Sequence, residues 1–338
     1  MRMSKKQCVV CLMSAAMGFI SLFGCGNEKS SKDNAIYYWR TTFRLNNYER
    51  DFLKKHNINK MYVKFFDVDK EWGQGAIPVG TTIFIDSFPK NIEIVPTVFI
   101  TSEAIKYYPE FSDKLLKRVE DMADVNGINF SEIQIDCDWK ESAAEKYFAF
   151  MKDFKSKLEK KDIKLSTTIR LSQFGYETPA ADYGVLMCYN TGDIKKWETA
   201  NSILDIEDIK LYLEKIKSCK LPLSVAFPNF GWDVSFTKYS PDDSEYYMEG
   251  IEYDKNDFSD ECFEKISENH YKMSKKSRYY GNVSVYIRHE EVTADDVLEA
   301  KKLIWENLSS APKQIILYHL DSANLSKFSD NEVEKIYR

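Results

Sequence analysis

The sequence predicts a (β/α)8 barrel with an aromatic-rich insertion between its seventh and eighth strands. Apolar strand-like runs alternate with amphipathic helical stretches almost throughout the chain, which indicates a parallel sheet covered by helices. Eight such strands can be counted, and eight is the number that closes this type of barrel. A doubly wound open sheet is the structural alternative, and the absence of a glycine-rich turn between a strand and a helix argues against it.

Each element is expected from its own pattern of side chains. The strands are short runs rich in apolar and β-branched residues. In the helix expected at 143–160, large apolar residues recur at helical spacing, and Thr293 followed by Asp296 is a typical pair at a helix start. The expected strands are residues 35–39, 60–66, 92–100, 132–138, 164–171, 183–189, 221–227 and 314–320. The expected helices are residues 47–55, 112–124, 143–160, 207–218 and 293–308.

The insertion covers about residues 230–288 and is rich in tyrosine. Connections of this length are usually functional or disordered, and the aromatic density argues against disorder. Two interpretations remain open. The aromatic residues either build the core of a small subdomain, or they form a platform beside the barrel mouth that is suited to stacking on sugar rings.

The first residues have the features of a targeting segment. A positively charged start is followed by an apolar run that ends in LFGC at residues 22–25, which resembles the lipobox of bacterial lipoproteins. We therefore expect residues 1–24 to be a lipoprotein signal peptide, Cys25 to be lipidated, residues 25–34 to be a flexible tether and residues 35–338 to be a single barrel domain. The expected location is the bacterial cell envelope, at the outer membrane or its periplasmic face, with acyl chains as the membrane anchor.

Composition and motifs exclude several classes of protein. The net charge of -6 and the absence of a basic stripe argue against a nucleic-acid partner. We expect no cofactor and no metal, because the 4 histidines are scattered and no phosphate-binding loop, dinucleotide fingerprint or zinc-protease motif is present. Four of the 7 cysteines lie beyond the expected anchor, at positions 137, 188, 219 and 262, and their spacing indicates neither a metal site nor a disulfide framework.

The most informative stretch is the fourth expected strand, which ends in two carboxylates. Alternate residues of a strand share a face, so Gln134, Asp136 and Asp138 point to the same side. A polar stripe at the carboxyl end of an apolar strand is where a (β/α)8 barrel places its chemistry. Two carboxyl groups this close would have separate pKa values, with one staying protonated as an acid. The alternative is that the pair caps the next helix or braces loops through salt bridges.

Nearly every other strand also ends in polar or aromatic residues, and these are the parts of a carbohydrate site: acids for glycosidic chemistry, hydrogen-bonding groups for hydroxyls and aromatic rings for sugar faces. Single members have structural alternatives, since His319 and Tyr189 could be core residues and Arg170 could form a structural ion pair with either aspartate. The candidate substrate-binding residues are Trp39, Arg40, Asp67, Trp139, Arg170, Tyr189, Asn190, Asn229, Trp232, His319 and Asp321.

The fourth-strand stretch resembles the D-x-x-D-x-D-x-E motif of chitinase and endo-N-acetylglucosaminidase barrels, glycoside hydrolase family eighteen. Asp136 and Asp138 fall on the second and third aspartates of that motif, and Trp139 follows as it does in the family. Residues 187–190 resemble the family's sixth-strand M-x-Y-D, in which the tyrosine, here Tyr189, helps to hold an acetamido group. Residues 228–231 look like its seventh-strand P-F-Y-G. The position of the family's first aspartate holds Ile133, and that of its catalytic glutamate holds Lys140.

A second resemblance is to a family of uncharacterised bacterial barrel lipoproteins, a domain of unknown function. It rests on residues 37–40, 134–138 and 165–168, spans most of the barrel and implies no established activity. Together, these features predict a lipid-anchored, glycan-processing barrel. The leading hypothesis is a glycoside hydrolase with Asp138 as catalytic carboxylate and Asp136 as its supporting partner. The alternative is a non-catalytic glycan-binding lipoprotein on a degenerate glycosidase-like barrel, which Lys140 favours.

Overall fold

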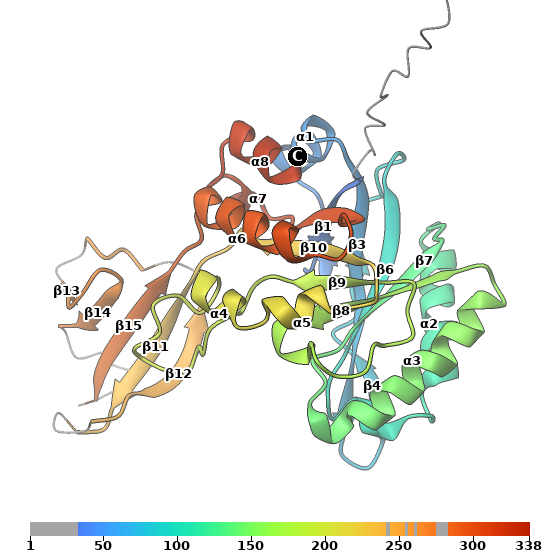
Figure 1. Ribbon diagram of the computed structural model, residues 1–338, viewed down its shortest axis with the longest axis horizontal. Coiled ribbons are helices and arrows are strands. Elements are labelled where there is room, and N and C mark those ends of the chain that lie inside the picture. Colours follow the sequence, from blue (N-terminus) through green and yellow to red (C-terminus); the bar gives the residue numbers. More distant parts are fainter. Residues whose placement is uncertain (1–32, 241–243, 254–255, 260–261, 275–282) are drawn as a thin grey trace, which may run out of the picture. The chain divides into compact units, whose positions relative to one another are not determined.

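The computed structural model describes residues 33–240, 244–253, 256–259, 262–274 and 283–338 (Figure 1). The predicted signal peptide and Cys25 lie outside the described residues. The described residues cluster as one compact unit. Among the described residues, no helix has both the length and the apolar character that a membrane span requires.

Eight parallel strands form a closed barrel, which confirms the predicted fold. Neighbouring strands pair in the order β1-β3-β6-β7-β8-β9-β10-β16, and β1 also pairs with β16, so the ring is complete. All eight expected strands are present, with ends that differ by a few residues. They are β1 (Asp33–Tyr38), β3 (Ile58–Glu71), β6 (Glu93–Ile100), β7 (Glu132–Asp136), β8 (Lys164–Arg170), β9 (Tyr183–Met187), β10 (Leu223–Pro228) and β16 (Gln314–Tyr318).

Helices cover the outside of the barrel (Figure 1). They are α1 (Asn47–Lys55), α2 (Ser112–Val125), α3 (Ala144–Glu159), α4 (Ile206–Lys210), α5 (Leu213–Lys217), α6 (Ala294–Asn307), α7 (Ser322–Leu325) and α8 (Asp330–Tyr337). The expected cap of α6 is confirmed, because the Thr293 side chain accepts a hydrogen bond from the backbone N–H of Asp296 and the Asp296 side chain bonds back to Thr293. The single helix expected at 207–218 is instead two short helices, α4 and α5.

Two connections between barrel strands contain no α-helix. Between β8 and β9 the chain forms only a short 3-10 helix, η3 (Leu171–Gln173), and a loop. Between β3 and β6 it forms two further strands, β4 (Gly75–Val79), which pairs antiparallel with β3, and β5 (Ile83–Phe84), which pairs with β2 (Thr42–Phe43). The first of these connections leaves room for an outer cavity beside β8.

The barrel interior is polar at the end where the strands begin. Glu132 is buried and accepts hydrogen bonds from Lys60 at 3.0 Å, Ser166 at 2.5 Å and Tyr183 at 2.5 Å. Higher in the barrel, the Tyr37 hydroxyl donates to Gln134 at 2.8 Å. Since every polar atom named here has a partner, this network fills the barrel as a satisfied core rather than as a pocket.

The insertion forms a separate antiparallel sheet beside the barrel (Figure 1). Trp197, from the connection after β9, contacts Phe236, Tyr246, His270 and Tyr286 of this sheet. The aromatic residues therefore do build a core of their own, as the first interpretation expects. The strands are β11 (Trp232–Lys238), β12 (Tyr247–Glu252), β13 (Phe263–Lys265), β14 (His270–Met273) and β15 (Ser284–Glu290), in the order β12-β11-β15-β14-β13.

Candidate functional site

A pocket of about 530 Å³ lies at the carboxyl ends of the barrel strands, and we call it the mouth pocket. Most of the site residues predicted from the sequence line it, although they come from seven different barrel strands or the segments that follow them. Those residues are Trp39, Asp67, Asp136, Asp138, Arg170, Tyr189, Asn190, Trp232 and His319. The fold therefore brings these nine side chains to one pocket.

Neighbouring strands β7 and β8 supply the acidic part of the mouth pocket. The Asp136 side chain is buried, with 2 % of the residue exposed, and accepts a hydrogen bond from the Thr168 hydroxyl at 2.5 Å. Asp138, two residues later, is exposed and pairs with Arg170, two residues after Thr168. Each aspartate thus lies beside a donor of β8, and these two donors are two residues apart on one face of that strand.

The two aspartates differ in their surroundings. Burial raises the pKa of Asp136 to about 6, although the positive charge of Arg170 acts to lower it, and the nearby charge of Asp138 adds to the rise. Arg170 donates to both oxygens of Asp138, from Nε at 2.5 Å and from Nη2 at 3.2 Å, and lies 4.0 Å from Asp136. The structural ion pair considered for Arg170 is therefore present, and it lies within the pocket wall.

Aromatic rings form a continuous second wall. Trp39 and Tyr189 each contact the ring of Tyr318, with centroids 6.3 and 5.0 Å apart, and Phe230 lies 6.1 Å from Tyr189 and 5.2 Å from Trp232. The wall continues from the barrel into the insertion, since Tyr253 contacts Trp232 and also lines the pocket. Trp232 and Tyr253 of the insertion therefore lie at the barrel mouth, which is the position that the platform interpretation requires.

Three polar atoms of mouth-pocket residues are buried without a hydrogen-bond partner in the described part of the chain: Asp67 Oδ1, Arg170 Nη1 and His319 Nδ1. Burial lowers the pKa of His319 to about 4, so its ring is neutral at pH 7. Buried polar groups are nearly always bonded, because an unpaired one costs about 1–3 kcal/mol. An acid oxygen, a guanidinium N–H and a neutral imidazole nitrogen of mouth-pocket residues therefore have hydrogen-bonding capacity that the described residues do not use.

Four predicted residues do not line the mouth pocket. Arg40 pairs with Glu49 at 2.9 Å, and Asp321 caps the start of α7 by accepting from two backbone N–H groups. Asn229 is buried and donates from its side chain to the backbone oxygen of His319 at 2.9 Å. These three residues hold the segments that carry pocket residues.

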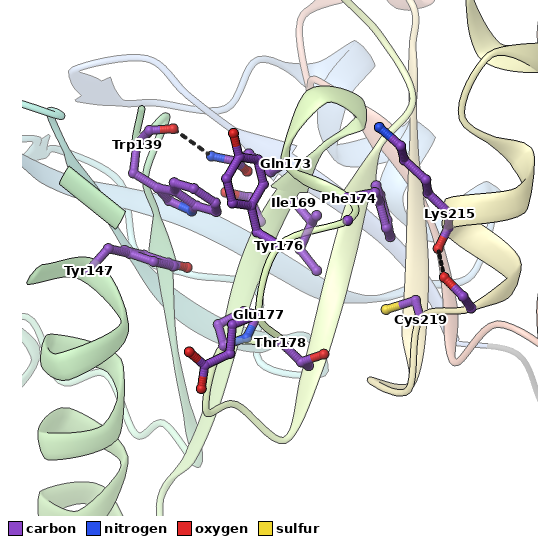
Figure 2. Close-up of a pocket in the computed structure, with 14 residues that line it drawn as sticks. Trp139, Tyr147, Ile169, Gln173, Phe174, Tyr176, Glu177, Thr178, Lys215 and Cys219 are labelled. Atoms are coloured by element: carbon purple, nitrogen blue, oxygen red, sulfur yellow. Dashed lines mark hydrogen bonds between the residues drawn. The ribbon is translucent and has the colours of Figure 1, made fainter. Parts of the chain in front are cut away.

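The fourth, Trp139, lies on the outside of the barrel, in an outer cavity of about 190 Å³ beside β8 (Figure 2). Its ring stacks against Tyr147 of α3, with centroids 5.4 Å apart, and its backbone oxygen accepts from the Gln173 side chain. Lys140 is exposed and lines neither this cavity nor the mouth pocket.

Sequence reasoning missed several residues that line the mouth pocket: Lys64, Phe99, Phe230, Tyr253, Tyr318 and Asn324. One signal could have found Tyr318, because it lies four residues after Gln314, on the same face of β16. Gln314 faces the barrel interior, where it accepts a hydrogen bond from Tyr62 at 2.5 Å. Lys64 is held by Asp67 at 2.7 Å, a contact between residues on one strand that alternation alone does not predict.

Comparisons with known proteins support the fold. No protein-family model matches the sequence, and no curated relative is found. Among solved structures, the chain is similar to a chitinase from Chromobacterium violaceum, with 12 % identity, a TM-score of 0.54, and coverage of 90 % of this chain and 98 % of that one. It is also similar to the spore cortex-lytic enzyme SleL of Bacillus megaterium, with 14 % identity, a TM-score of 0.51, and coverage of 91 % and 74 %.

A third similar structure is the chitinase ChiB from the chitin utilization locus of Flavobacterium johnsoniae, with 11 % identity, a TM-score of 0.51, and coverage of 90 % and 93 %. At such identities the likeness establishes a shared barrel fold.

Proposed function

We propose that the mouth pocket binds a saccharide and that the protein is a glycan-processing barrel, a glycoside hydrolase in which Asp136 and Asp138 are the reacting acid groups. The observation that carries the proposal is that one pocket combines residues with unpartnered polar atoms and an aromatic wall. Arg170 Nη1 needs an acceptor, and Asp67 Oδ1 needs a donor. A sugar hydroxyl can act as the acceptor or as the donor, and the faces of sugar rings can stack on the aromatic wall.

The two aspartates divide the roles of hydrolysis. Asp136, with its raised pKa, supplies the proton to the glycosidic oxygen as the bond to the sugar carbon breaks, and the bonding electrons leave with that oxygen. Asp138, held by Arg170, presents a negative charge to the positive sugar carbon. Water then adds to that carbon, and the proton it releases returns to Asp136. In this scheme the acid is Asp136, and Asp138 has the charged role.

The non-catalytic alternative rests on two specific observations. Lys140 occupies the position of the catalytic glutamate in the motif that the sequence resembles, and it is exposed outside the mouth pocket. Arg170 engages both oxygens of Asp138, which limits the freedom of that carboxylate to act on water. Both features fit a barrel that binds a glycan without cleaving it.

The glycan class we propose is an N-acetylated amino-sugar polymer of the cell envelope. Similar structures include chitinases of Ostrinia furnacalis, one solved with a chitin oligosaccharide and one with allosamidin, and a cortex-lytic enzyme. We further propose that Cys25 carries the lipid that holds the barrel at the bacterial envelope, close to such polymers. This part rests on the sequence of residues 1–34 alone.

One experiment tests both forms of the proposal. The chain from residue 26 onward is titrated with N-acetylchitopentaose and with peptidoglycan glycan fragments by calorimetry, and the same mixtures are analysed by mass spectrometry for cleaved products. Binding with cleavage that Asp136→Asn abolishes supports the hydrolase. Binding without cleavage supports the alternative. Absence of binding across a broad glycan array overturns both, and Thr178→Ala, in the outer cavity, is the control expected to behave as wild type.

A further inference from the structure

A buried ion pair in the insertion sheet contacts the mouth pocket through one aromatic side chain. Arg288 and Glu290 lie on β15, and both side chains are 0 % exposed. Arg288 Nε donates to Glu290 Oε1 at 2.5 Å. Burying two charges is costly, and a pair of apolar side chains often gives equal stability, so an ion pair in such a place is weak evidence for a stabilising role.

The other oxygen of Glu290 holds a pocket residue. Glu290 Oε2 accepts from the indole N–H of Trp232 at 2.7 Å and from the Ser202 hydroxyl at 2.6 Å. Trp232 and Glu290 are direct cross-strand partners on β11 and β15, so the backbone places the carboxylate opposite the indole. The indole N–H is the only polar group of that side chain, and this bond fixes how the ring is turned.

A glycine permits this close approach. A Cβ atom added at Gly231 would lie 2.7 Å from the backbone oxygen of Glu290, closer than Cβ atoms occur in proteins. Because Gly231 has no side chain, the backbone just before Trp232 can come against β15, and the indole can reach the carboxylate. The sequence Gly231-Trp232 therefore belongs to the same arrangement.

Arg288 extends the arrangement to a second segment of the chain. Its terminal nitrogens donate to the backbone oxygens of Lys196 and, at 3.1 Å, Ile194, in the connection that follows β9. That connection includes Asn190, which lines the mouth pocket. The ion pair thus ties β11, which carries Trp232, to the segment that carries Asn190.

We propose that Glu290 is a positioning residue, held by Arg288, that fixes the Trp232 indole as a stacking surface for a sugar ring in the mouth pocket. The stacking role rests on the proposed saccharide function, whereas the fixing of the ring is a property of the free protein. Stacking depends on ring orientation, so a fixed indole lowers the entropy lost when a sugar binds.

The test begins with the free protein. The indole N–H resonance of Trp232 is assigned by its loss in Trp232→Phe, and its hydrogen exchange is measured in the full chain. We expect a strongly protected proton. The contribution of Trp232 to the near-ultraviolet circular dichroism is the difference between wild type and Trp232→Phe. We expect Glu290→Gln to lose this contribution and Glu249→Gln to keep it. Glu249 is the matched control, because it lies on β12 of the same sheet and accepts from Thr237 at 2.5 Å.

The second arm uses N-acetylchitopentaose as the probe. Glu290→Gln and Trp232→Phe should each weaken its binding by about tenfold, the factor expected for one lost ring contact, and their effects should not add in the double variant. If Glu290→Gln does not fold, the double variant Arg288→Met with Glu290→Leu, which removes both charges, is measured in its place. The exchange measurement on the wild-type chain does not depend on either variant.

A rapidly exchanging Trp232 indole, or an unchanged dichroism signal in folded Glu290→Gln, would overturn the proposal. Failure of every saccharide to bind would instead reject the proposed function and the stacking role, while the exchange and dichroism results would still decide whether Glu290 fixes the ring.

Discussion

Arg170 donates two hydrogen bonds to the carboxylate of Asp138, at 2.5 and 3.2 Å, while it lies 4.0 Å from Asp136. This two-pronged contact divides the aspartates into a charged partner of Arg170 and a buried acid bonded to Thr168. The division reverses the emphasis of the sequence analysis, in which Asp138 is the leading catalytic residue. In the proposed reaction the proton comes from Asp136.

Replacing Arg170 should change the titration of Asp136. The guanidinium acts to lower the pKa of that carboxyl, so Arg170→Met should raise it above its present value of about 6, and the pH range in which saccharide is cleaved should extend upward. Arg170→Lys keeps the charge but loses the two-pronged contact, so it should change the pH profile less and binding more. The measurement is the rate of cleavage against pH for the three proteins.

The control for this prediction is Arg118→Met, since Arg118 donates to Thr81 outside the mouth pocket. If the Arg170 variants keep the pH profile of the wild type, the charge of Arg170 does not set the pKa of the acid that takes part in cleavage. If no cleavage occurs in any of them, nuclear magnetic resonance titration of the Asp136 carboxyl gives the same comparison.

Gln173 holds the segment that carries Asp138. Its side-chain nitrogen donates to the backbone oxygens of Cys137 at 3.0 Å and Trp139 at 3.4 Å, and its side-chain oxygen accepts from the backbone N–H of Arg170 at 2.9 Å. Figure 2 shows its contact with Trp139 at the outer cavity. Gln173→Ala should therefore lower the free energy of unfolding by about 2–3 kcal/mol and weaken saccharide binding. Urea denaturation and calorimetry measure the two effects.

The matched control is Thr178→Ala, which also lies in the outer cavity but makes none of these contacts. A Gln173→Ala protein with the stability and affinity of Thr178→Ala would show that the Asp138 segment needs no such support.

Lys140 should prove unimportant in this structure, although its position draws attention in the sequence. Its side chain is exposed and lines neither cavity. Lys140→Ala should change the free energy of unfolding by less than about 0.5 kcal/mol and leave saccharide binding unchanged. Lys140→Glu should create no cleavage activity, because a carboxylate there would face solvent. Strong loss of binding in the alanine variant, or new cleavage in the glutamate variant, would place this position in the site after all.

The barrel and its polar rim could be predicted from the sequence because both follow from strand periodicity. Strands buried on both faces read as apolar runs, and a period of two places Asp136 and Arg170 on inward faces of neighbouring strands. The prediction weakens where a strand ends. β7 ends at Asp136, so the period of two no longer applies at Trp139 and Lys140, and the chain carries Trp139 to the outer cavity.

The arrangement of the insertion could not be predicted, because its contacts join residues far apart in the sequence. Trp197 lies outside the expected insertion and yet packs in its core, and Glu290 reaches Trp232 across 58 residues. Composition indicated an ordered, aromatic-rich segment, but register between distant strands is set by such pairings and not by local pattern.

The membrane anchor is a prediction from residues outside the described structure. Cys25→Ala should block lipidation and leave a precursor that is uncleaved or mislocalised, and removal of residues 1–25 should give a chain that does not partition with membranes. The acyl chains supply the affinity, at roughly 0.8 kcal/mol for each buried methylene, whereas the net charge of -6 adds no attraction to anionic lipid. Detergent-phase partitioning measures this, and Cys219→Ala is the control. A Cys25→Ala protein that matures and partitions as wild type does would reject the lipobox.

The last prediction concerns the stability of the folded protein against pH. The pKa of Asp136 rises from 3.8 to about 6 on folding, so the folded state holds this proton more tightly than the unfolded state. The stability gained from that proton is fully present below about pH 4 and is lost as the pH rises through about 6, a change of up to about 3 kcal/mol. Asp136→Asn removes this titration. The wild type should therefore lose stability between pH 4 and pH 7 that the variant keeps. The difference in free energy of unfolding, variant minus wild type, should increase over this range, as measured by urea denaturation at several pH values. Asp121→Asn, at an exposed ion pair with Lys117, should follow the wild-type curve. Parallel curves for Asp136→Asn and wild type would mean that the Asp136 carboxyl has the same pKa in the folded and unfolded states, and the proposed proton donor would have to be sought elsewhere in the mouth pocket.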